Sequence, residues 1–412
     1  MSPRTLERHA TVTSLTERRR SHGADALDPD VHEPRRRARR PLASRPPGRR
    51  SSLFLTLFGL VAVLNLIGLA MILSASSVTS LEDNGSPWSQ FLRQLAWFGI
   101  GVVAMVIAMR TDYHRWRKHC GYGVILVIVL LALVFVPHVG VSANGARRWL
   151  GYGPFSLQPS ELAKLVLVVF WADLLARRSK WIEDLRLTLL PVLLSFGVIA
   201  ALIMRQPNLG TTTIIFAIML TMLFVGGAPL RWVGGVAAAG AAAGFAFARL
   251  SSWRWKRITA FANPWADPHN TGYQPLEAQI AVADGGITGV GLGQSRAKWK
   301  FLPEADTDFI FSIISEEAGL IGALLVIGLF VALAVAGTLV AMRSKDRYGM
   351  LVAAGITSWF LAQAFLNIGQ SVGALPVMGV PLPFVSAGGS SLVVNLMAVG
   401  MLLNVARQAS PR

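Results

Sequence analysis

The chain has 412 residues, of which 53% are hydrophobic and only 15% are charged. A soluble globular domain carries about 25% charged residues, so this composition argues against a soluble enzyme and favours a protein folded in a lipid bilayer. The net charge of +17 does not indicate a nucleic-acid partner, because it is concentrated in the N-terminal tail and in short loops between apolar segments.

The first fifty residues are rich in Arg, Pro, Ser and Asp, with thirteen Arg against six acidic residues. Such a composition cannot bury a hydrophobic core, so we expect residues 1–50 to form a disordered, basic, cytoplasmic tail. The segment is too long and too rich in Arg to be the start of a cleaved signal peptide. Two roles stay open: orienting the protein while contacting anionic membrane lipid, or docking a cytoplasmic partner.

Ten apolar segments follow the tail, and about 20 residues of helix are enough to cross the hydrocarbon core of a bilayer. The sequence therefore predicts an all-α, polytopic membrane protein with about ten transmembrane helices in one domain over residues 51–408. The segments lie at 52–76, 91–109, 121–139, 158–176, 188–204, 211–227, 232–250, 309–341, 350–374 and 386–406.

The loops after the second, fourth, sixth and eighth segments are basic, as Arg110, Arg177, Arg231 and Arg343 illustrate. Basic loops stay on the cytoplasmic side of a membrane, and ten spans return the chain to the side on which it started. We therefore expect both termini to be cytoplasmic.

Several loops on the opposite, extracytoplasmic face are also basic, against this bias. They contain Arg147, Arg148, Arg205, Arg254, Lys256, Arg257, Arg296, Lys298 and Lys300. An anionic ligand at the outer membrane surface would explain these residues. The alternative is that they pair with nearby acidic residues or with lipid phosphate.

The loop between the seventh and eighth helices, at about 251–308, is the longest in the chain. It holds four Trp residues and a series of Gly residues, and loops of this length are usually functional or disordered. The aromatic content favours an ordered structure that lies along the membrane, with an amphipathic helix at about 274–284.

Charged residues are rare inside the apolar segments, where a charge costs about 2.5–3.5 kcal/mol at mid-helix. Glu161 and Lys164 are three positions apart, so they share a helix face and are able to pair. They either form a structural ion pair or line a polar cavity. We expect one of Glu316 and Glu317 to meet a cation or a backbone group on a neighbouring helix.

Asp308 closes the long loop where the eighth helix begins. A carboxylate at this place is either a cap or first-turn acid of that helix, or a general base at the outer membrane surface. The glycine-rich string GVGLGQ does not fit a nucleotide-binding loop, because the following Lys is misplaced and ATP is absent from the outer side.

Six separated strings resemble the motifs of the SEDS (shape, elongation, division and sporulation) family of bacterial cell-wall polymerases, in the family's order and over about residues 52–408. They are NGARRWLGYGPFSLQPSELAK at 144–164, RQPNLGT at 205–211, GYQ at 272–274, GVGLGQS at 289–295, LPEADTDFIF at 302–311 and PVMGVPLPFVSAGGSS at 376–391. The first string and FVGGAPLRW resemble the division member of the family more than the elongation member.

This resemblance implies a peptidoglycan glycosyltransferase in the bacterial cell membrane, with its active site on the outer face. The substrate would be lipid II, which is polymerised into β-1,4 glycan strands with release of undecaprenyl pyrophosphate, in septal synthesis during cell division. The partners would be a class B penicillin-binding protein transpeptidase and other division proteins. A lipid II flippase and a non-catalytic division scaffold are the competing functions.

The resemblance also implies roles for particular residues. Asp308 matches the essential aspartate and would be the general base, with a pKa raised by partial burial and by the nearby Asp306. The residues expected to bind substrate are Arg147, Arg148, Glu161, Lys164, Arg205, Lys298, Ser386, Gly388, Gly389 and Ser390. Arg147, Arg148 and Lys298 would hold the pyrophosphate, while the small residues of the last motif would permit close approach of helices and backbone.

Asn208, Asp306 and Ala387 depart from the family pattern, which has Asp, His and Tyr at these positions. No cofactor is evident and no metal-ligand spacing is present in the sequence. A divalent cation that assists departure of the pyrophosphate stays open.

Overall fold

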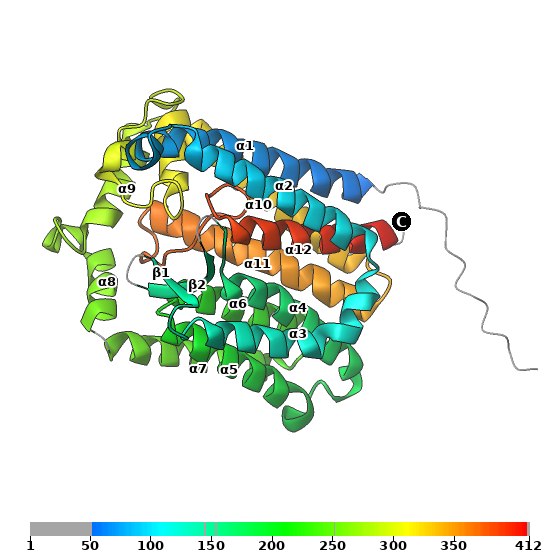
Figure 1. Ribbon diagram of the computed structural model, residues 1–412. Coiled ribbons are helices and arrows are strands. Elements are labelled where there is room, and N and C mark those ends of the chain that lie inside the picture. Colours follow the sequence, from blue (N-terminus) through cyan, green and yellow to red (C-terminus); the bar gives the residue numbers. More distant parts are fainter. Residues whose placement is uncertain (1–51, 144–145, 153–154, 251, 410–412) are drawn as a thin grey trace, which may run out of the picture. The chain divides into compact units, whose positions relative to one another are not determined.

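The computed structural model describes residues 52–143, 146–152, 155–250 and 252–409 (Figure 1). These residues belong to one compact unit, Gly48–Arg412. The predicted tail at 1–50 lies outside the described residues.

Ten helices of the described residues correspond one to one to the ten predicted segments. Eight of them are long and apolar enough to cross a membrane, while the remaining two are α6, with 17 residues, and α4, whose 19 residues include four charged ones. The protein is thus an all-α, polytopic membrane protein. The helices are α1 (Ser52–Asn84), α2 (Ser89–Arg110), α3 (Tyr113–Leu133), α4 (Pro159–Arg177), α5 (Leu190–Arg205), α6 (Leu209–Val225), α7 (Leu230–Arg249), α10 (Ile310–Met342), α11 (Arg347–Ser371) and α12 (Ser390–Gln408).

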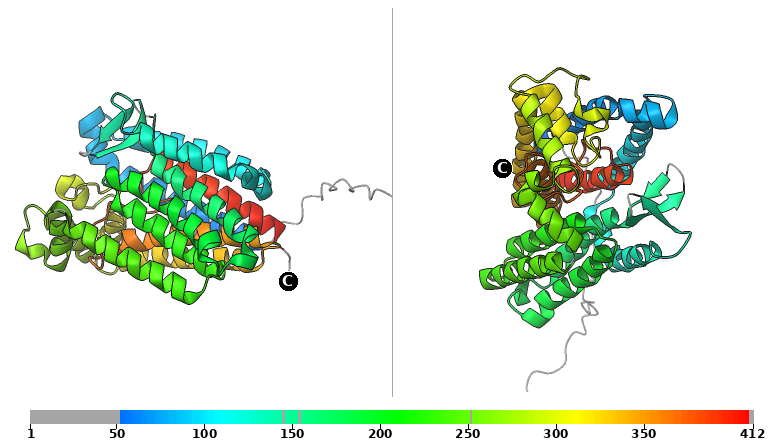
Figure 2. Two further views of the ribbon diagram at one scale, coloured as in Figure 1. Left: turned by 90° about the horizontal axis from the view of Figure 1, so that it is seen from below. Right: turned by 90° about the vertical axis from the view of Figure 1, so that its left-hand side faces the viewer.

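The centre of the bundle is formed by α11 and α12, whose residues are mostly buried, whereas α7 is almost entirely exposed. Figure 2 shows α12 in red and α11 in orange, surrounded by the other helices. α12 packs against α2 so closely that a Cβ atom added at Gly400 would lie 2.3 Å from the carbonyl oxygen of Met105. Small residues at this contact let the two helices approach, as in other membrane bundles.

A small antiparallel sheet between α3 and α4 is a feature that the sequence did not predict. Its strands are β1 (Gly140–Ala143), β2 (Ala146–Tyr152) and β3 (Phe155–Leu157), in the order β1-β2-β3. Leu150 of β2 pairs with Gly140 on one side and Leu157 on the other. β2 is therefore the central strand, and it carries the two adjacent basic residues of the first motif.

The long loop before α10 is largely ordered, as predicted. It contains α8 (Ser252–Ala262), η3 (Pro264–Ala266), α9 (Tyr273–Asp284) and η4 (Ala297–Phe301). α9 confirms the helix expected at about 274–284. Two short helices, η1 (Ser179–Trp181) and η2 (Leu185–Leu189), connect α4 to α5.

Candidate active site

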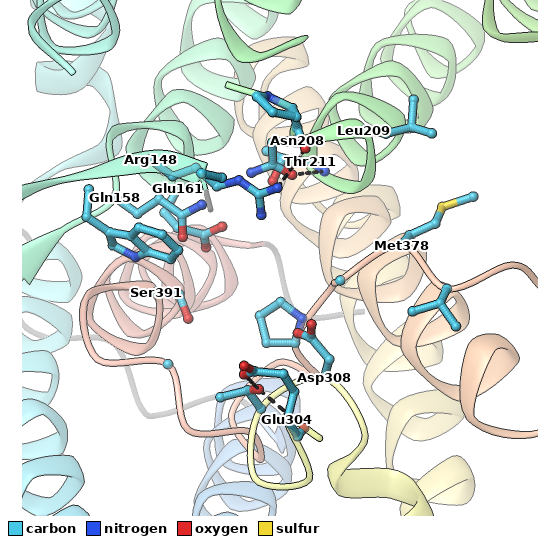
Figure 3. A pocket seen from close by; sticks show the side chains of 18 of the residues that line it. Arg148, Gln158, Glu161, Asn208, Leu209, Thr211, Glu304, Asp308, Met378 and Ser391 are labelled. Atoms are coloured by element: carbon cyan, nitrogen blue, oxygen red, sulfur yellow. Dashed lines mark hydrogen bonds between the residues drawn. The ribbon is translucent and has the colours of Figure 1, made fainter. Parts of the chain in front are cut away.

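A cavity of about 990 Å³ opens at the end of the bundle that carries the sheet and α8. Its wall includes the first turns of α2, α4, α6 and α12, so four helix N-termini surround it. A helix N-terminus carries a partial positive charge and unpaired N–H groups, which favours an anionic ligand. Figure 3 shows Arg148, Glu161 and Asn208 on one side of the cavity, with Asp308 and Glu304 on the other.

Asp308 lines this cavity and does not cap α10, whose N-cap residue is Phe309. Its backbone carbonyl accepts hydrogen bonds from the amides of Asn367 and Gln370 on α11, both at 2.8 Å. Gly379 lies against its carboxylate, because a Cβ atom added there would be 3.3 Å from Oδ2 of Asp308, at a φ of +67°. The structure therefore favours the site interpretation of Asp308 over the cap interpretation.

The segment before Asp308 is held by the last motif. The Ser386 hydroxyl donates to the carbonyl of Thr307 at 2.6 Å, and the Ala387 N–H donates to the carbonyl of Asp306 at 2.9 Å. Ser386 thus holds the backbone before Asp308 without lining the cavity. In contrast, Gly388, Gly389 and Ser390 of the same motif line it.

Burial raises the pKa of Asp308 to about 7, with a further contribution from the negative charge of Glu304. Arg148 and Arg257 oppose this rise, and Asp306 adds to it weakly. The expected increase through burial is therefore confirmed. A carboxyl group with a pKa near neutrality is partly deprotonated and able to accept a proton at physiological pH.

Arg148 reaches the cavity from β2, and two backbone carbonyls beyond the end of α5 fix its guanidinium. Its Nε donates to the oxygen of Gln206 at 3.0 Å and its Nη2 to that of Pro207 at 2.6 Å. Successive residues of a strand point to opposite faces, so Arg147 is exposed and does not line the cavity.

Arg257 of α8 is a second cation in the cavity wall, which the sequence did not single out. Burial lowers the pKa of Arg257, the positive charge of Arg148 lowers it further, and Asp308 raises it. The two guanidinium groups are thus close enough to repel each other, with Asp308 as their counter-charge. The one available signal was a basic residue in a loop predicted to be extracytoplasmic, and five other cations of that loop give the same signal.

Glu161 and Lys164 form the predicted ion pair, with 2.9 Å between Lys164 Nζ and Glu161 Oε2, and both side chains are buried. Glu161 lines the cavity, whereas Lys164 lies behind it and donates to Oε1 of Gln363 at 3.0 Å. Gln363 in turn donates to the carbonyl of Pro381 at 2.8 Å. The pair thus links the cavity wall to the first half of the last motif, at 376–391.

Two further predicted substrate-binding residues lie outside the cavity lining. Arg205 is exposed at the end of α5. Lys298 is buried in η4, where its ammonium donates to the carbonyl of Gly293 and lies 3.8 Å from Oε1 of Glu317. This contact confirms the cation expected near Glu316 and Glu317, and it leaves Lys298 anchoring a loop and away from the cavity.

Other polar groups of the lining were not predicted as site residues. They include Gln90, Arg93, Gln94, Gln158, Thr211, Gln274 and Glu304. Within the described residues, no group of three or more His, Cys, Asp and Glu is arranged to hold a metal ion.

Comparison with known proteins identifies several relatives. The FtsW/RodA/SpoVE family model, described as "Cell cycle protein", matches residues 54–411. Stage V sporulation protein E of Bacillus subtilis (strain 168) is 42% identical over 362 residues, covering 87% of this chain and 98% of the relative. The probable peptidoglycan glycosyltransferase FtsW of Mycobacterium tuberculosis (strain ATCC 25618 / H37Rv) is 40% identical over 402 residues, covering 96% of this chain and 76% of the relative.

Two solved structures share the fold. One chain of a peptidoglycan synthase complex, studied for the coordination of polymerization and crosslinking, has a TM-score of 0.71 at 28% identity, covering 85% of this chain and 96% of its own. The rod shape determining protein RodA of Thermus thermophilus has a TM-score of 0.63 at 26% identity, covering 86% and 97%.

Proposed function

The chain belongs to the FtsW/RodA/SpoVE family of cell cycle proteins, and from this premise we propose that it polymerises lipid II as a peptidoglycan glycosyltransferase. The reaction joins C1 of a donor MurNAc to the 4-hydroxyl of an acceptor GlcNAc and releases undecaprenyl pyrophosphate. The observation that carries this function is the placement of Asp308 opposite two arginines in one large cavity.

Asp308 is the general base of the proposed mechanism. Its carboxylate takes the proton of the acceptor hydroxyl while the hydroxyl oxygen forms the bond to C1 of the donor. Proton transfer of this kind contributes about 10²–10⁴-fold to a rate when the base has a pKa near the working pH. The pKa of about 7 for Asp308 meets this requirement, because burial and Glu304 raise it from its ordinary range.

Arg148 and Arg257 stabilise the leaving group. As the bond from C1 to the lipid pyrophosphate breaks, the bonding electrons and the negative charge move to the phosphate oxygens. Guanidinium groups bind phosphate through paired, charge-assisted hydrogen bonds. The two carbonyls that hold Arg148 fix this cation before substrate arrives, so little reorganisation is needed during the reaction.

Glu161, Gly388, Gly389 and Ser390 contact the substrate from the cavity wall. Lys164 and Ser386 position these groups without lining the cavity themselves. Because Arg147, Arg205 and Lys298 lie outside the lining, we do not assign them to the pyrophosphate.

The orientation that we propose places both termini in the cytoplasm and the cavity on the outer face of the cell membrane. In Figure 1, the start of α1 and the end of α12 lie together at one end of the bundle, opposite the sheet and α9. The basic residues of the sequence support this assignment, since Arg110 and Arg177 end α2 and α4 and Arg343 follows α10, all at the end shared with the termini.

The partner that we propose is a class B penicillin-binding protein transpeptidase, acting with other division proteins in septal wall synthesis. The similar chain from a peptidoglycan synthase complex supports this choice, because polymerization and crosslinking are coordinated there. We expect α10 and α11 to contribute to the contact. Cross-links that place the partner only on other helices would refute this expectation.

The function is tested by incubating the purified, detergent-solubilised protein with lipid II, alone and with its transpeptidase. We expect glycan chains, and no acceleration of lipid II movement between leaflets in vesicles. Movement without chains would favour a flippase, and neither activity, even with the partner present, would favour a scaffold.

A further inference from the structure

α10 is interrupted at its tenth residue, Gly319. This residue has φ +65° and ψ −163°, and a Cβ atom added to it would lie 2.4 Å from both the nitrogen of Gly289 and the oxygen of Ile287. A residue with a side chain is therefore excluded here by strain and by contact with backbone. The break brings the segment 286–292, which we call the glycine loop, against the helix.

Backbone hydrogen bonds join the glycine loop to both sides of the break. The N–H groups of Val290 and Gly291 donate to the carbonyls of Glu316 and Glu317 at 2.9 and 3.1 Å. Below the break, Leu320 N–H donates to the Gly286 carbonyl at 2.9 Å, and the Ile321 N–H donates to the Ile287 carbonyl. These bonds satisfy several backbone groups of the loop, and irregular backbone exposed to lipid does not occur within the hydrocarbon core, so the loop is expected at the edge of that core.

Two helices independently place the break at the outer edge of the hydrocarbon core. Ser74 of α1 donates to Glu317 and follows the first residue of α1 by 22 positions. Ile321 precedes the last residue of α10 by 21 positions. At about 1.5 Å per residue both distances are about 32 Å, close to the hydrocarbon thickness of about 30 Å. Both distances are counted from ends that basic residues flank, since Arg50 precedes the first residue of α1 and Arg343 follows the last residue of α10. These basic residues mark the cytoplasmic boundary of the membrane.

The glycine loop presents apolar side chains at this depth. Ile287 is 69% exposed and Leu292 is 75% exposed. They continue the exposed apolar face of α10, where Leu320 and Ile321 are 52% and 62% exposed and Leu324 follows one turn below. In water such a continuous surface would be unfavourable, whereas at the boundary between headgroups and acyl chains it is buried.

We propose that the glycine loop inserts into the outer leaflet of the membrane and is a lipid-binding element of this protein. The loop leads directly through η4 to Asp308, so its insertion sets the height of the catalytic segment above the bilayer. This inference rests on the helix break, the depth and the exposed side chains, and it does not depend on the reaction that the cavity performs.

The test measures the depth of single spin labels in lipid nanodiscs. Cys120 is the single cysteine of the chain, so Cys120→Ser gives a background for Ile287→Cys and Leu292→Cys. Leu324→Cys, on the exposed face of α10, is the lipid reference, and Glu183→Cys, in the exposed connection between η1 and η2, is the water reference. Oxygen concentrates in lipid and a nickel chelate in water, so their relaxation effects report depth.

We expect oxygen to relax the labels at 287 and 292 several-fold more than the nickel chelate does, as at 324. Relaxation like that at 183 would overturn the proposal. A third outcome is water-like relaxation in the isolated protein that changes to protection from both agents when a transpeptidase is added. This outcome would assign the surface to a protein partner and would also overturn the proposal. The use of two loop positions prevents one disturbed variant from deciding the result.

Discussion

Asp306 and Asp308 are two residues apart, but their carboxyl groups have different surroundings. Burial raises the pKa of both groups. Asp308 alone of the two lines the cavity, where it interacts with Arg148 and Arg257. Asp308 is therefore both accessible to a substrate hydroxyl and adjusted to accept its proton, and Asp306 is a natural control for it.

The raised pKa of Asp308 predicts the pH dependence of the reaction. A base must be deprotonated, so the polymerisation rate should increase as the pH rises through about 7, the pKa of this group. Glu304→Gln removes a negative charge that raises this pKa, so the increase should occur at lower pH. Rates measured from pH 5 to 9 for both proteins check this, and an unchanged profile for the variant would contradict it.

Arg148 and Arg257, the two cavity arginines that interact with Asp308, should be needed for departure of the pyrophosphate. We expect Arg148→Gln and Arg257→Gln each to lower kcat about 10²–10³-fold, the usual cost of losing one donor that stabilises developing charge. Arg147→Gln is the matched control, because this neighbour is exposed and outside the lining. Steady-state kinetics with lipid II would refute the assignment if the control lost as much activity as the cavity variants.

At the scale of elements, α11 is the helix that holds the backbone of Asp308, the proposed base, in place. Gln363, Asn367 and Gln370 share one face of α11, at spacings of four and three residues. The amide of Gln363 donates to the carbonyl of Pro381, and the amide of Gln370 donates to that of Asp308. The amide of Asn367 donates to the carbonyls of both Val380 and Asp308. This polar face in an apolar helix joins the first half of the last motif to the loop of Asp308.

Asn367→Leu should lower kcat about 10–100-fold. The substitution leaves the carbonyls of Asp308 and Val380 without this donor, and a buried polar group that loses its partner costs about 1–3 kcal/mol. Thr357→Val is the control, since the Thr357 hydroxyl bonds only within α11, to the carbonyl of Ala353. If both variants showed equal kcat, α11 would not position Asp308.

Removing one partner of the buried pair in α4 should destabilise the fold, because the other charge is then left buried without its partner. Glu161→Gln leaves the ammonium of Lys164 without its carboxylate, and loss of one partner from a buried pair costs about 3–5 kcal/mol. The double variant Glu161→Gln, Lys164→Met should recover much of this loss. Thermal unfolding in detergent checks both, and a double variant less stable than the single one would show that the pair itself stabilises the bundle.

The sequence predicts helices well here because a bilayer imposes their length and apolar character. The predicted helix bounds are less accurate where a helix begins with polar residues. α3 begins at Tyr113, before the predicted 121, because Asp112 caps a polar first turn by accepting from the N–H of His114. β1 to β3 were missed because strands of three to seven residues leave little periodic signal.

For the whole molecule, the sequence predicted the carboxylate that we propose as the base but not all of its surroundings. Asp308 and Arg148 were found through motifs, whereas Arg257 depends on how α8 folds back over the cavity. Lys298 illustrates the opposite error, because a basic residue in an outer loop can pair with a buried carboxylate such as Glu317. Charge in a loop therefore predicts an anionic site, but the packing decides which cations form it.

The most direct test of the account is the rate of lipid II polymerisation by wild type, Asp308→Asn and Asp306→Asn, each purified with its transpeptidase. We predict a loss of at least about 10²-fold for Asp308→Asn, the contribution of a general base. Asp306→Asn should stay close to wild type, because its backbone contact with Ala387 is kept and its side chain does not line the cavity. Equal rates for the two variants would contradict the assignment of Asp308 as the base.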